Sequence, residues 1–374
     1  MTTSRCCWST RRGDPTTRAL RTRPLHAPTI RASDVFDDGL LDNELALSVA
    51  DESLRRMAES GARVRLEVEA AAQAGDRLDE LESPRAVAAV GTDARLLRAV
   101  LEPWCPVPFV AWPGPGLPGW AGALDLVVVL VPGGGDPGTV SASSEAVRRG
   151  CGLIVACPPD SMLFEHAQGR HTVLFPTHTG DSLAAAVAVL LGLQRLGLGP
   201  EVNPESVATV LDEVAIACSP SRDISQNPAK ELALVLADTL PLVWGGSVLA
   251  ARAGRRVAEA LRRLSGRPAL AADADHLLPV MTDLPVPDLF ADPFADSGAA
   301  DPPMRPSLLV LDDGAGDPVV REQHGRLMAA ADEHGVRSHT LSADEGPEVA
   351  RYASLLSTGS YAAEYLAIGL GRVS

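Results

Sequence analysis

Short apolar runs alternate with helical segments along most of this chain of 374 residues. The clearest run is 124–131, whose unbroken valines suit a strand that is covered on both faces. Further strands are predicted at 85–90, 107–112, 152–156, 172–175, 242–244, 268–271, 307–311 and 338–341. Helices are predicted at 45–72, 139–149, 183–196, 204–217, 228–239, 249–264, 319–333 and 349–369, and a further one is capped by Thr92 or Asp93 and runs through Val100. This order predicts an α/β fold in which helices cover parallel strands on both sides.

The order of strands and helices occurs twice, which predicts two subdomains. Each should be a parallel sheet flanked by helices, a three-layer αβα sandwich. We place the first at 34–198 and the second at 199–374, with Gly61 as a possible break in the first helix. Residues 1–33 lack hydrophobic periodicity and are expected to form a disordered tail. Residues 285–305 hold five prolines and are expected to form an exposed loop.

The formal net charge of −15 argues against nucleic acid or an anionic membrane as a main partner. Residues 1–33 run against this trend with seven arginines and one acid, but they contain no apolar core of signal-peptide length. The longest apolar run, 183–193, is far shorter than the roughly 20 residues that span a bilayer. We therefore expect no membrane partner.

The six cysteines form no CxxC pair, and no histidines stand at zinc-finger spacing, so neither a metal site nor a cofactor is expected. Cys151 and Cys157 lie in an apolar strand pattern and are interpreted as small buried side chains. The chain is therefore expected to be cytoplasmic, with reduced thiols.

The only lysine of the chain lies in the segment Asn227-Pro228-Ala229-Lys230-Glu231-Leu232-Ala233. Asn227 is a good N-cap and Pro228 fits the first helical position, so a helix is predicted to begin here. A lysine near a helix N-terminus is slightly unfavourable, which indicates a partner for Lys230. A structural role, in an ion pair or at the interface between subdomains, is the favoured interpretation of Asn227 and Lys230.

This segment, followed by Pro241-Leu242-Val243-Trp244-Gly245, resembles the opening of the second half of the bifunctional phosphoglucose/phosphomannose isomerases. Residues 124–150 are similar to that family's strand, phosphate loop and helix. Arg195-Leu196-Gly197-Leu198 resembles the end of its first domain, and residues 359–367 resemble its C-terminal helix. The resemblance covers roughly residues 40–374 and looks closest to the actinobacterial branch. It implies two sugar isomerase (SIS) domains in a homodimer.

In that family a loop of Ser-Gly-Asn-Thr type binds the sugar phosphate through hydroxyls and backbone N–H groups at a helix N-terminus. The matching stretch here is 133–139. The residues that the resemblance implies in phosphosugar binding are Gly133, Gly134, Gly135, Thr139 and Ser141. Asp136 stands about where a hydroxyl is expected, and a role as N-cap is favoured. A carboxylate ~4 Å from a phosphate would repel it by about 4 kcal/mol at an effective dielectric of 20.

Aldose–ketose isomerisation needs a carboxylate base and a group that opens the sugar ring. The family's glutamate base corresponds to about Arg263, which could contact a phosphate but cannot act as a base. The ring-opening histidine should lie near Pro279, and His276 is the nearest candidate. An arginine that the family has early in the 183–196 region appears as Thr179. The catalytic residues therefore look degenerate, and whether the chain is an enzyme stays open.

Two functions remain open. One is a binding or regulatory protein that senses a sugar phosphate or nucleotide sugar, or that partners a neighbouring enzyme. The other is a divergent isomerase that acts on glucose 6-phosphate or mannose 6-phosphate. A cavity with only arginines and backbone donors would favour the first, and a carboxylate and a histidine converging on one cavity would favour the second. The expected partners are a sugar phosphate or related small molecule and a second copy of the chain.

Overall fold

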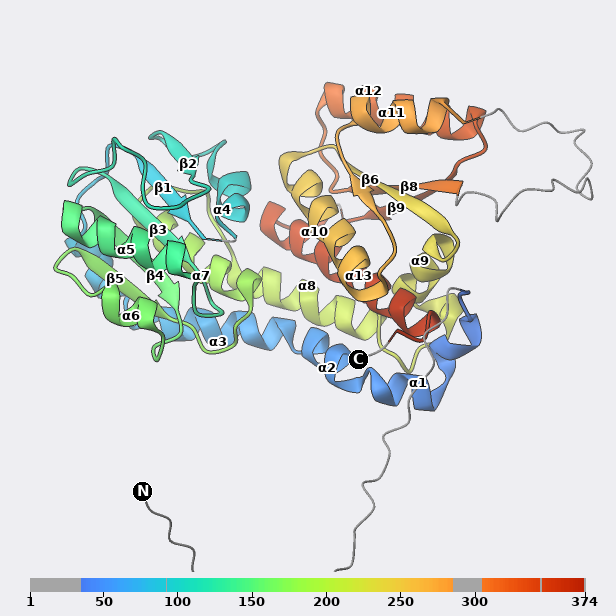
Figure 1. Cartoon of the computed structure of the whole chain (residues 1–374), viewed down its shortest axis with the longest axis horizontal. Helices are drawn as coiled ribbons and strands as arrows, with labels where there is room; N and C mark the ends of the chain where they lie inside the picture. Colours follow the sequence, from blue (N-terminus) through green and yellow to red (C-terminus); the bar gives the residue numbers. More distant parts are fainter. Residues whose placement is uncertain (1–34, 92, 285–304, 344, 373–374) are drawn as a thin grey trace, which may run out of the picture.

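Two parallel sheets organise the computed structural model, which describes residues 35–91, 93–284, 305–343 and 345–372. The first sheet has the order β2-β1-β3-β4-β5 and the second the order β7-β6-β8-β9. The strands are β1 (Val87–Val90), β2 (Phe109–Ala111), β3 (Leu126–Leu130), β4 (Gly152–Cys157), β5 (Thr172–Pro176), β6 (Thr239–Gly245), β7 (Leu270–Ala271), β8 (Arg305–Asp312) and β9 (Arg337–Ser342). The predicted α/β class, with two helix-flanked parallel sheets, is confirmed (Figure 1).

Helices cover both faces of each sheet. The helices of the first half are α1 (Glu44–Val49), α2 (Asp51–Ala58), α3 (Ser60–Ala72), α4 (Ala94–Leu101), α5 (Pro137–Arg149), α6 (Met162–His166) and α7 (Ser182–Arg195). Those of the second half are α8 (Pro204–Ala217), α9 (Pro228–Leu236), α10 (Val248–Ser265), α11 (Ala274–Thr282), α12 (Pro318–Glu333) and α13 (Glu348–Gly369). Short 3-10 helices occur at η1 (Asp38–Asp42), η2 (Gly75–Glu80) and η3 (Ile224–Gln226).

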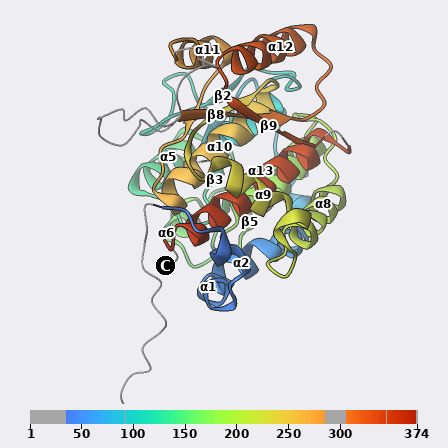
Figure 2. The same cartoon turned by 90° about the vertical axis from the view of Figure 1, so that its right-hand side faces the viewer.

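Strand β3 shows why the valine run indicated a strand that is covered on both faces. Val127 and Val129 pack with α5 and α6, while Val128 and Leu130 face α7 and the main core. The second sheet is arranged in the same way: α11 and α12 cover one face, and α9, α10 and α13 cover the other. Figure 2 shows α11 and α12 on the opposite side of β8 and β9 from α13.

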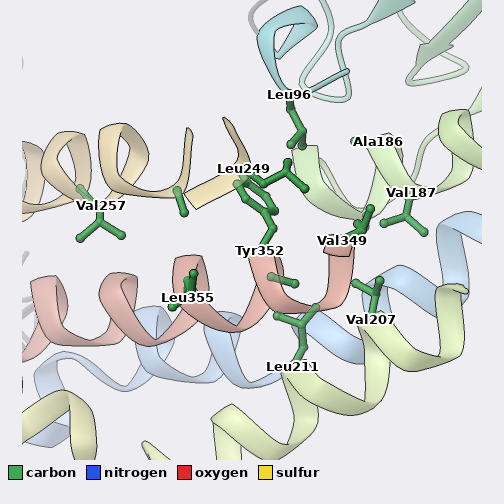
Figure 3. Close-up of a cluster of buried hydrophobic side chains, with 14 of the residues drawn as sticks. Leu96, Ala186, Val187, Val207, Leu211, Leu249, Val257, Val349, Tyr352 and Leu355 are labelled. Carbon is green, nitrogen blue, oxygen red and sulfur yellow. The ribbon is translucent and has the colours of Figure 1, made fainter. Parts of the chain in front are cut away.

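One apolar cluster joins the two lobes (Figure 3). The side chains labelled in Figure 3 come from α4, α7, α8, α10 and α13 and include Leu96, Val187, Val207, Leu211, Leu249, Val349 and Tyr352. Burial of apolar surface contributes roughly 25 cal/mol per Å², so separating the lobes would be costly. Helix α8 lies alongside both α3 and α13 and so bridges the lobes. The predicted division at residue 198 stays a prediction.

Several boundaries differ from the expectations. The helix expected at 45–72 is interrupted at Ala50 and Glu59, and Gly61 lies inside α3. Gly61 serves packing instead, because a Cβ there would lie 2.1 Å from Asp212 Oδ1 of α8. Helix α9 ends at Leu236 rather than at 239, because Thr239 already begins β6.

The short helices α6 and α11 have no counterpart among the predicted elements. Helix α6 has only five residues, and α11 contains Pro279, which is unfavourable inside a helix. The tail predicted at 1–33 and residues 285–304 of the predicted loop lie outside the described residues, and Arg305 is already part of β8.

Among the described residues no helix is both long and apolar enough to cross a membrane. The same residues contain no cluster of three or more histidine, cysteine or acidic side chains that could hold a metal ion. Cys105, Cys151, Cys157 and Cys218 are free thiols.

Candidate functional site

The order of the first sheet reverses between its neighbouring strands β1 and β3, because the chain leaves β1 toward β2 and leaves β3 toward β4. In open α/β sheets, ligands bind outside the carboxyl ends of the strands at such a point. Gly91 follows β1 with a φ of 111°, and a Cβ there would lie 2.6 Å from the Leu130 carbonyl oxygen of β3. Only glycine fits this close approach without strain.

A cavity of about 560 Å³ lies at this position, between the first sheet and helix α10 of the second lobe. Its charged and hydroxyl-bearing lining residues are Arg95, Asp136, Thr139, Arg252, Arg256 and Glu259. We call it the arginine cavity. Three arginines face two carboxylates, so its net charge is positive. Because α10 belongs to the second lobe, the cavity is complete only when the two lobes are packed together.

Arg252 is the most buried of these cations, with 11% of its side chain exposed. Its Nη2 lies 3.5 Å from Asp93 Oδ1, at the limit of a hydrogen bond, and its Nε is buried without a hydrogen-bond partner. Burial lowers the pKa of the Arg252 guanidinium, and the charges of Arg256 and Arg95 act in the same direction. A guanidinium in this position is stabilised by an anion entering the cavity.

The other two arginines are more accessible. Arg256 Nη1 lies 3.0 Å from Glu259 Oε2, one turn away on α10. Arg95 is exposed and forms no ion pair within the described part of the chain. Both can reorient toward a ligand, because surface ion pairs are worth less than ~1 kcal/mol.

The glycine-rich loop ends in a carboxylate that caps the next helix. Asp136 is the N-cap of α5, and its Oδ1 accepts hydrogen bonds from the N–H groups of Gly138 at 2.7 Å and Thr139 at 3.1 Å. The Thr139 hydroxyl donates to the Asp136 carbonyl oxygen at 2.8 Å. The backbone donors that would receive a phosphate are therefore bound to the protein's own carboxylate.

A second carboxylate occupies the loop after β5 in the same manner. Glu67 Oε1 accepts hydrogen bonds from the N–H groups of His178 at 2.9 Å and Thr179 at 2.7 Å, and from the Thr179 hydroxyl. Glu67 is 1% exposed, and its Oε2 is buried without a partner. Thr179, the position where the resembled family has an arginine, is thus held away from ligand binding by α3.

The residues predicted from sequence are distributed over several places. Thr139 lines the arginine cavity, whereas Gly133, Gly134, Gly135 and Ser141 do not belong to its lining. Gly134 and Gly135 have φ values of 106° and 75°, which form the turn before Asp136. Ser141 is exposed on α5.

Arg263 and His276, the weaker candidates, are both exposed and outside the cavity lining. Arg263 lies near the buried Glu364, whose pKa is raised by burial, held down somewhat by Ser53 and by the charge of Arg263. His276 lies on α11, which packs against α12 on the far face of the second sheet.

Asn227 and Lys230 lie in the interior, away from the cavity. Asn227 caps α9 by accepting from the N–H groups of Ala229 and Lys230. The Lys230 side chain is fully buried, and its Nζ donates to Asp42 at 2.7 Å and to two backbone carbonyls. These contacts fit the structural role favoured for both residues.

Sequence reasoning missed Arg95, Arg252, Arg256 and Glu259. The last three recur at spacings of four and three along α10, which places them on one face of a helix. That spacing indicates a charged face on the helix. It does not distinguish a ligand-binding face from an ordinary exposed polar face.

Comparisons with known proteins agree with this architecture. Residues 225–372 match the family described as the bacterial phospho-glucose isomerase C-terminal SIS domain. Among curated proteins the sequence has no match.

Solved structures share the fold over most of the chain. The C-terminal domain of glucosamine-fructose-6-phosphate aminotransferase from Francisella tularensis is 13% identical, with a TM-score of 0.59 over 85% of this chain and 96% of that one. A glucose-6-phosphate isomerase like protein from Thermus thermophilus is 19% identical, with a TM-score of 0.51 over 88% and 92%. Tagatose-6-phosphate ketose/aldose isomerase from Escherichia coli is 13% identical, with a TM-score of 0.54 over 86% and 92%.

Proposed function

We propose that this protein, a phosphoglucose-isomerase-like member of the SIS-domain proteins, binds a sugar phosphate in the arginine cavity. The solved structures that share its fold include proteins named for sugar phosphates. The observation that carries the proposal is Arg252, a largely buried cation of the cavity lining whose contact with Asp93 is long, at 3.5 Å. A phosphate group supplies the acceptors and the negative charge that this guanidinium lacks, and Arg95 and Arg256 add two further cations. Calorimetric titration with glucose 6-phosphate and mannose 6-phosphate tests the proposal.

Phosphate binding by arginine side chains differs from binding by a helix N-terminus. Here Asp136 already occupies the first N–H groups of α5, so the proposed phosphate position lies on the guanidinium groups instead. The arginine cavity therefore offers guanidinium groups in place of the hydroxyls of the family's loop.

The second candidate function is an isomerase in which Glu259 is the base. Glu259 lines the arginine cavity one helical turn before Arg263, the position that the family resemblance assigns to a glutamate. A carboxylate of this kind could move a proton between C1 and C2 of a bound sugar. None of the described residues that line the cavity is a histidine, so this chain places no histidine there that could open the sugar ring. Binding without turnover is therefore the function we favour.

Replacing Asp136 with serine is expected to tighten glucose 6-phosphate binding by about 1–2 kcal/mol, roughly 5- to 30-fold in Kd. Serine is as good an N-cap as aspartate, so α5 should remain intact, while a negative charge leaves the cavity. Asp37→Ser, at the N-cap of η1, is the matched control and should leave Kd unchanged. Weaker binding by Asp136→Ser would mean that the carboxylate contacts the ligand directly.

We also propose that the protein is a cytoplasmic homodimer, as in the resembled family and its actinobacterial branch. The long apolar helices α7 and α13 offer no surplus apolar surface for a dimer, because both are buried inside the chain's own core. The dimer therefore rests on the resemblance, and light scattering at micromolar concentration tests it. The free thiols agree with a reducing compartment.

A further inference from the structure

A second cavity, of about 510 Å³, lies at the carboxyl ends of β6 and β8, the strands between which the order of the second sheet reverses. It is lined by the start of α10, the loop 313–317, the first turn of α13 and Trp104 of the first lobe. We propose that this cavity binds an uncharged polyhydroxylated ligand, such as a free sugar. The proposal does not depend on what the arginine cavity binds.

The second cavity is lined by both donor and acceptor side chains. Asp313 is 8% exposed; its Oδ2 accepts a hydrogen bond from the Ser247 hydroxyl, and its Oδ1 has no partner among the described residues. Arg351 Nη1 donates to the Asp313 carbonyl oxygen at 2.5 Å, while its Nε is buried without a partner. Glu348 is exposed and unpaired within the described chain. A hydroxyl both donates and accepts, so a polyol can satisfy this mixed set.

A buried polar atom without a hydrogen-bond partner also lies on the other side of the loop 313–317. There a smaller cavity of about 290 Å³ is lined by Trp244 and His324, whose rings stack at 5.8 Å. His324 Nε2 is buried without a partner. Most buried polar atoms in proteins are hydrogen-bonded, so Arg351 Nε and His324 Nε2 mark two polar atoms beside one loop that a bound water or ligand would satisfy.

Charge excludes a phosphate from the second cavity. Three carboxylates, those of Asp313, Asp317 and Glu348, oppose the single cation Arg351. The arginine cavity has the opposite balance, with three cations and two carboxylates. A phosphate would be repelled here, whereas an uncharged ligand meets no such repulsion.

Trp104 supplies an aromatic face on which a sugar ring can pack. Trp104 is 57% exposed at the cavity wall, so its ring face is accessible to a ligand. A flat aromatic face can pack on the C–H face of a sugar ring, while the carboxylates and Arg351 bind its hydroxyls.

Ligand-observed NMR titration of the full chain with D-glucose and with D-mannose tests the proposal. Saturable binding of at least one of them is expected for the wild type. The variants Trp104→Ala and Glu348→Gln should each bind about tenfold more weakly or worse, because they remove the stacking face and one charged acceptor. Trp120→Ala, which removes an exposed tryptophan outside the cavity, is the matched control and should bind like the wild type.

Two results would overturn the proposal: no saturable binding of either sugar, or unchanged binding by Trp104→Ala. Displacement of the bound sugar by an equal concentration of glucose 6-phosphate would also contradict it, because the sugar would then occupy the arginine cavity. Binding of glucosamine without binding of either neutral sugar would also contradict the proposal, because the cavity would then select a cation. Glucose 6-phosphate binding, measured in parallel, should be unaffected by Trp104→Ala, which separates failure here from failure of the proposed function.

Discussion

Replacing Lys230 with methionine is expected to lower the free energy of unfolding by about 1.5–3 kcal/mol, the loss typical of hydrogen bonds to a charged group. The ammonium is fully buried and donates to Asp42 Oδ1 at 2.7 Å, the Pro220 carbonyl at 3.0 Å and the Arg222 carbonyl at 2.8 Å. It also lies 5.5 Å from the ring centre of Tyr365. Methionine keeps the length of the side chain but removes all three donors, so the carboxylate and two carbonyls lose their partner. Urea denaturation measures the loss.

An exposed ion pair provides the control for Lys230. Arg55 pairs with Asp51 at 2.5 Å, but 67% of its side chain is exposed. Arg55→Met should therefore cost less than ~1 kcal/mol. If Lys230→Met also lies within about 1 kcal/mol of the wild type, the three hydrogen bonds contribute little and the structural role of Lys230 is wrong.

Replacing Arg252 with methionine is expected to weaken glucose 6-phosphate binding by about 1.5–3 kcal/mol, roughly 10- to 150-fold in Kd. Asp93, whose side chain is 7% exposed, would lose the guanidinium beside it, so the unliganded variant is also expected to be less stable than the wild type. Calorimetry gives the Kd, and urea denaturation gives the stability.

Arg255 is the matched control on the same helix. It is 58% exposed, lies 3.7 Å from Asp273 and does not line the arginine cavity. Arg255→Met should bind glucose 6-phosphate like the wild type. Equal loss of binding in both variants would show that overall charge, and not the position of Arg252, determines affinity. The urea measurement on Arg252→Met separates this loss of binding from any loss of folded protein.

Most of the fold was accessible from local patterns in the sequence. Helix α8 has the predicted bounds, because Asn203 and Pro204 form a clear start before an apolar periodic run. Strand β3 was recognisable from its valines, and the N-cap role favoured for Asp136 agrees with its two backbone hydrogen bonds. Each of these features is determined by residues close together in the chain.

The candidate site was less accessible because it depends on how the two lobes pack. Arg252 is separated from Asp93 by 159 positions in sequence, and only the apolar cluster between the lobes brings them together. Glu67 binds the loop at Thr179 from 112 positions away in sequence, and no local sequence pattern predicts this contact. The family resemblance placed the catalytic position at Arg263, one turn beyond Glu259. Counting along a helix does not reveal which of its faces meets the cavity.

The central claim is that the arginine cavity binds a sugar phosphate without converting it. Its most direct test is calorimetric titration of the wild type with glucose 6-phosphate and mannose 6-phosphate, combined with a coupled isomerase assay on the same sample. We expect saturable binding of at least one ligand, with turnover below about 1 s⁻¹, the low end of usual enzyme rates. Absence of binding by both ligands would contradict the claim. Turnover above that rate that disappears in Glu259→Gln would contradict it as well, and would establish the isomerase instead.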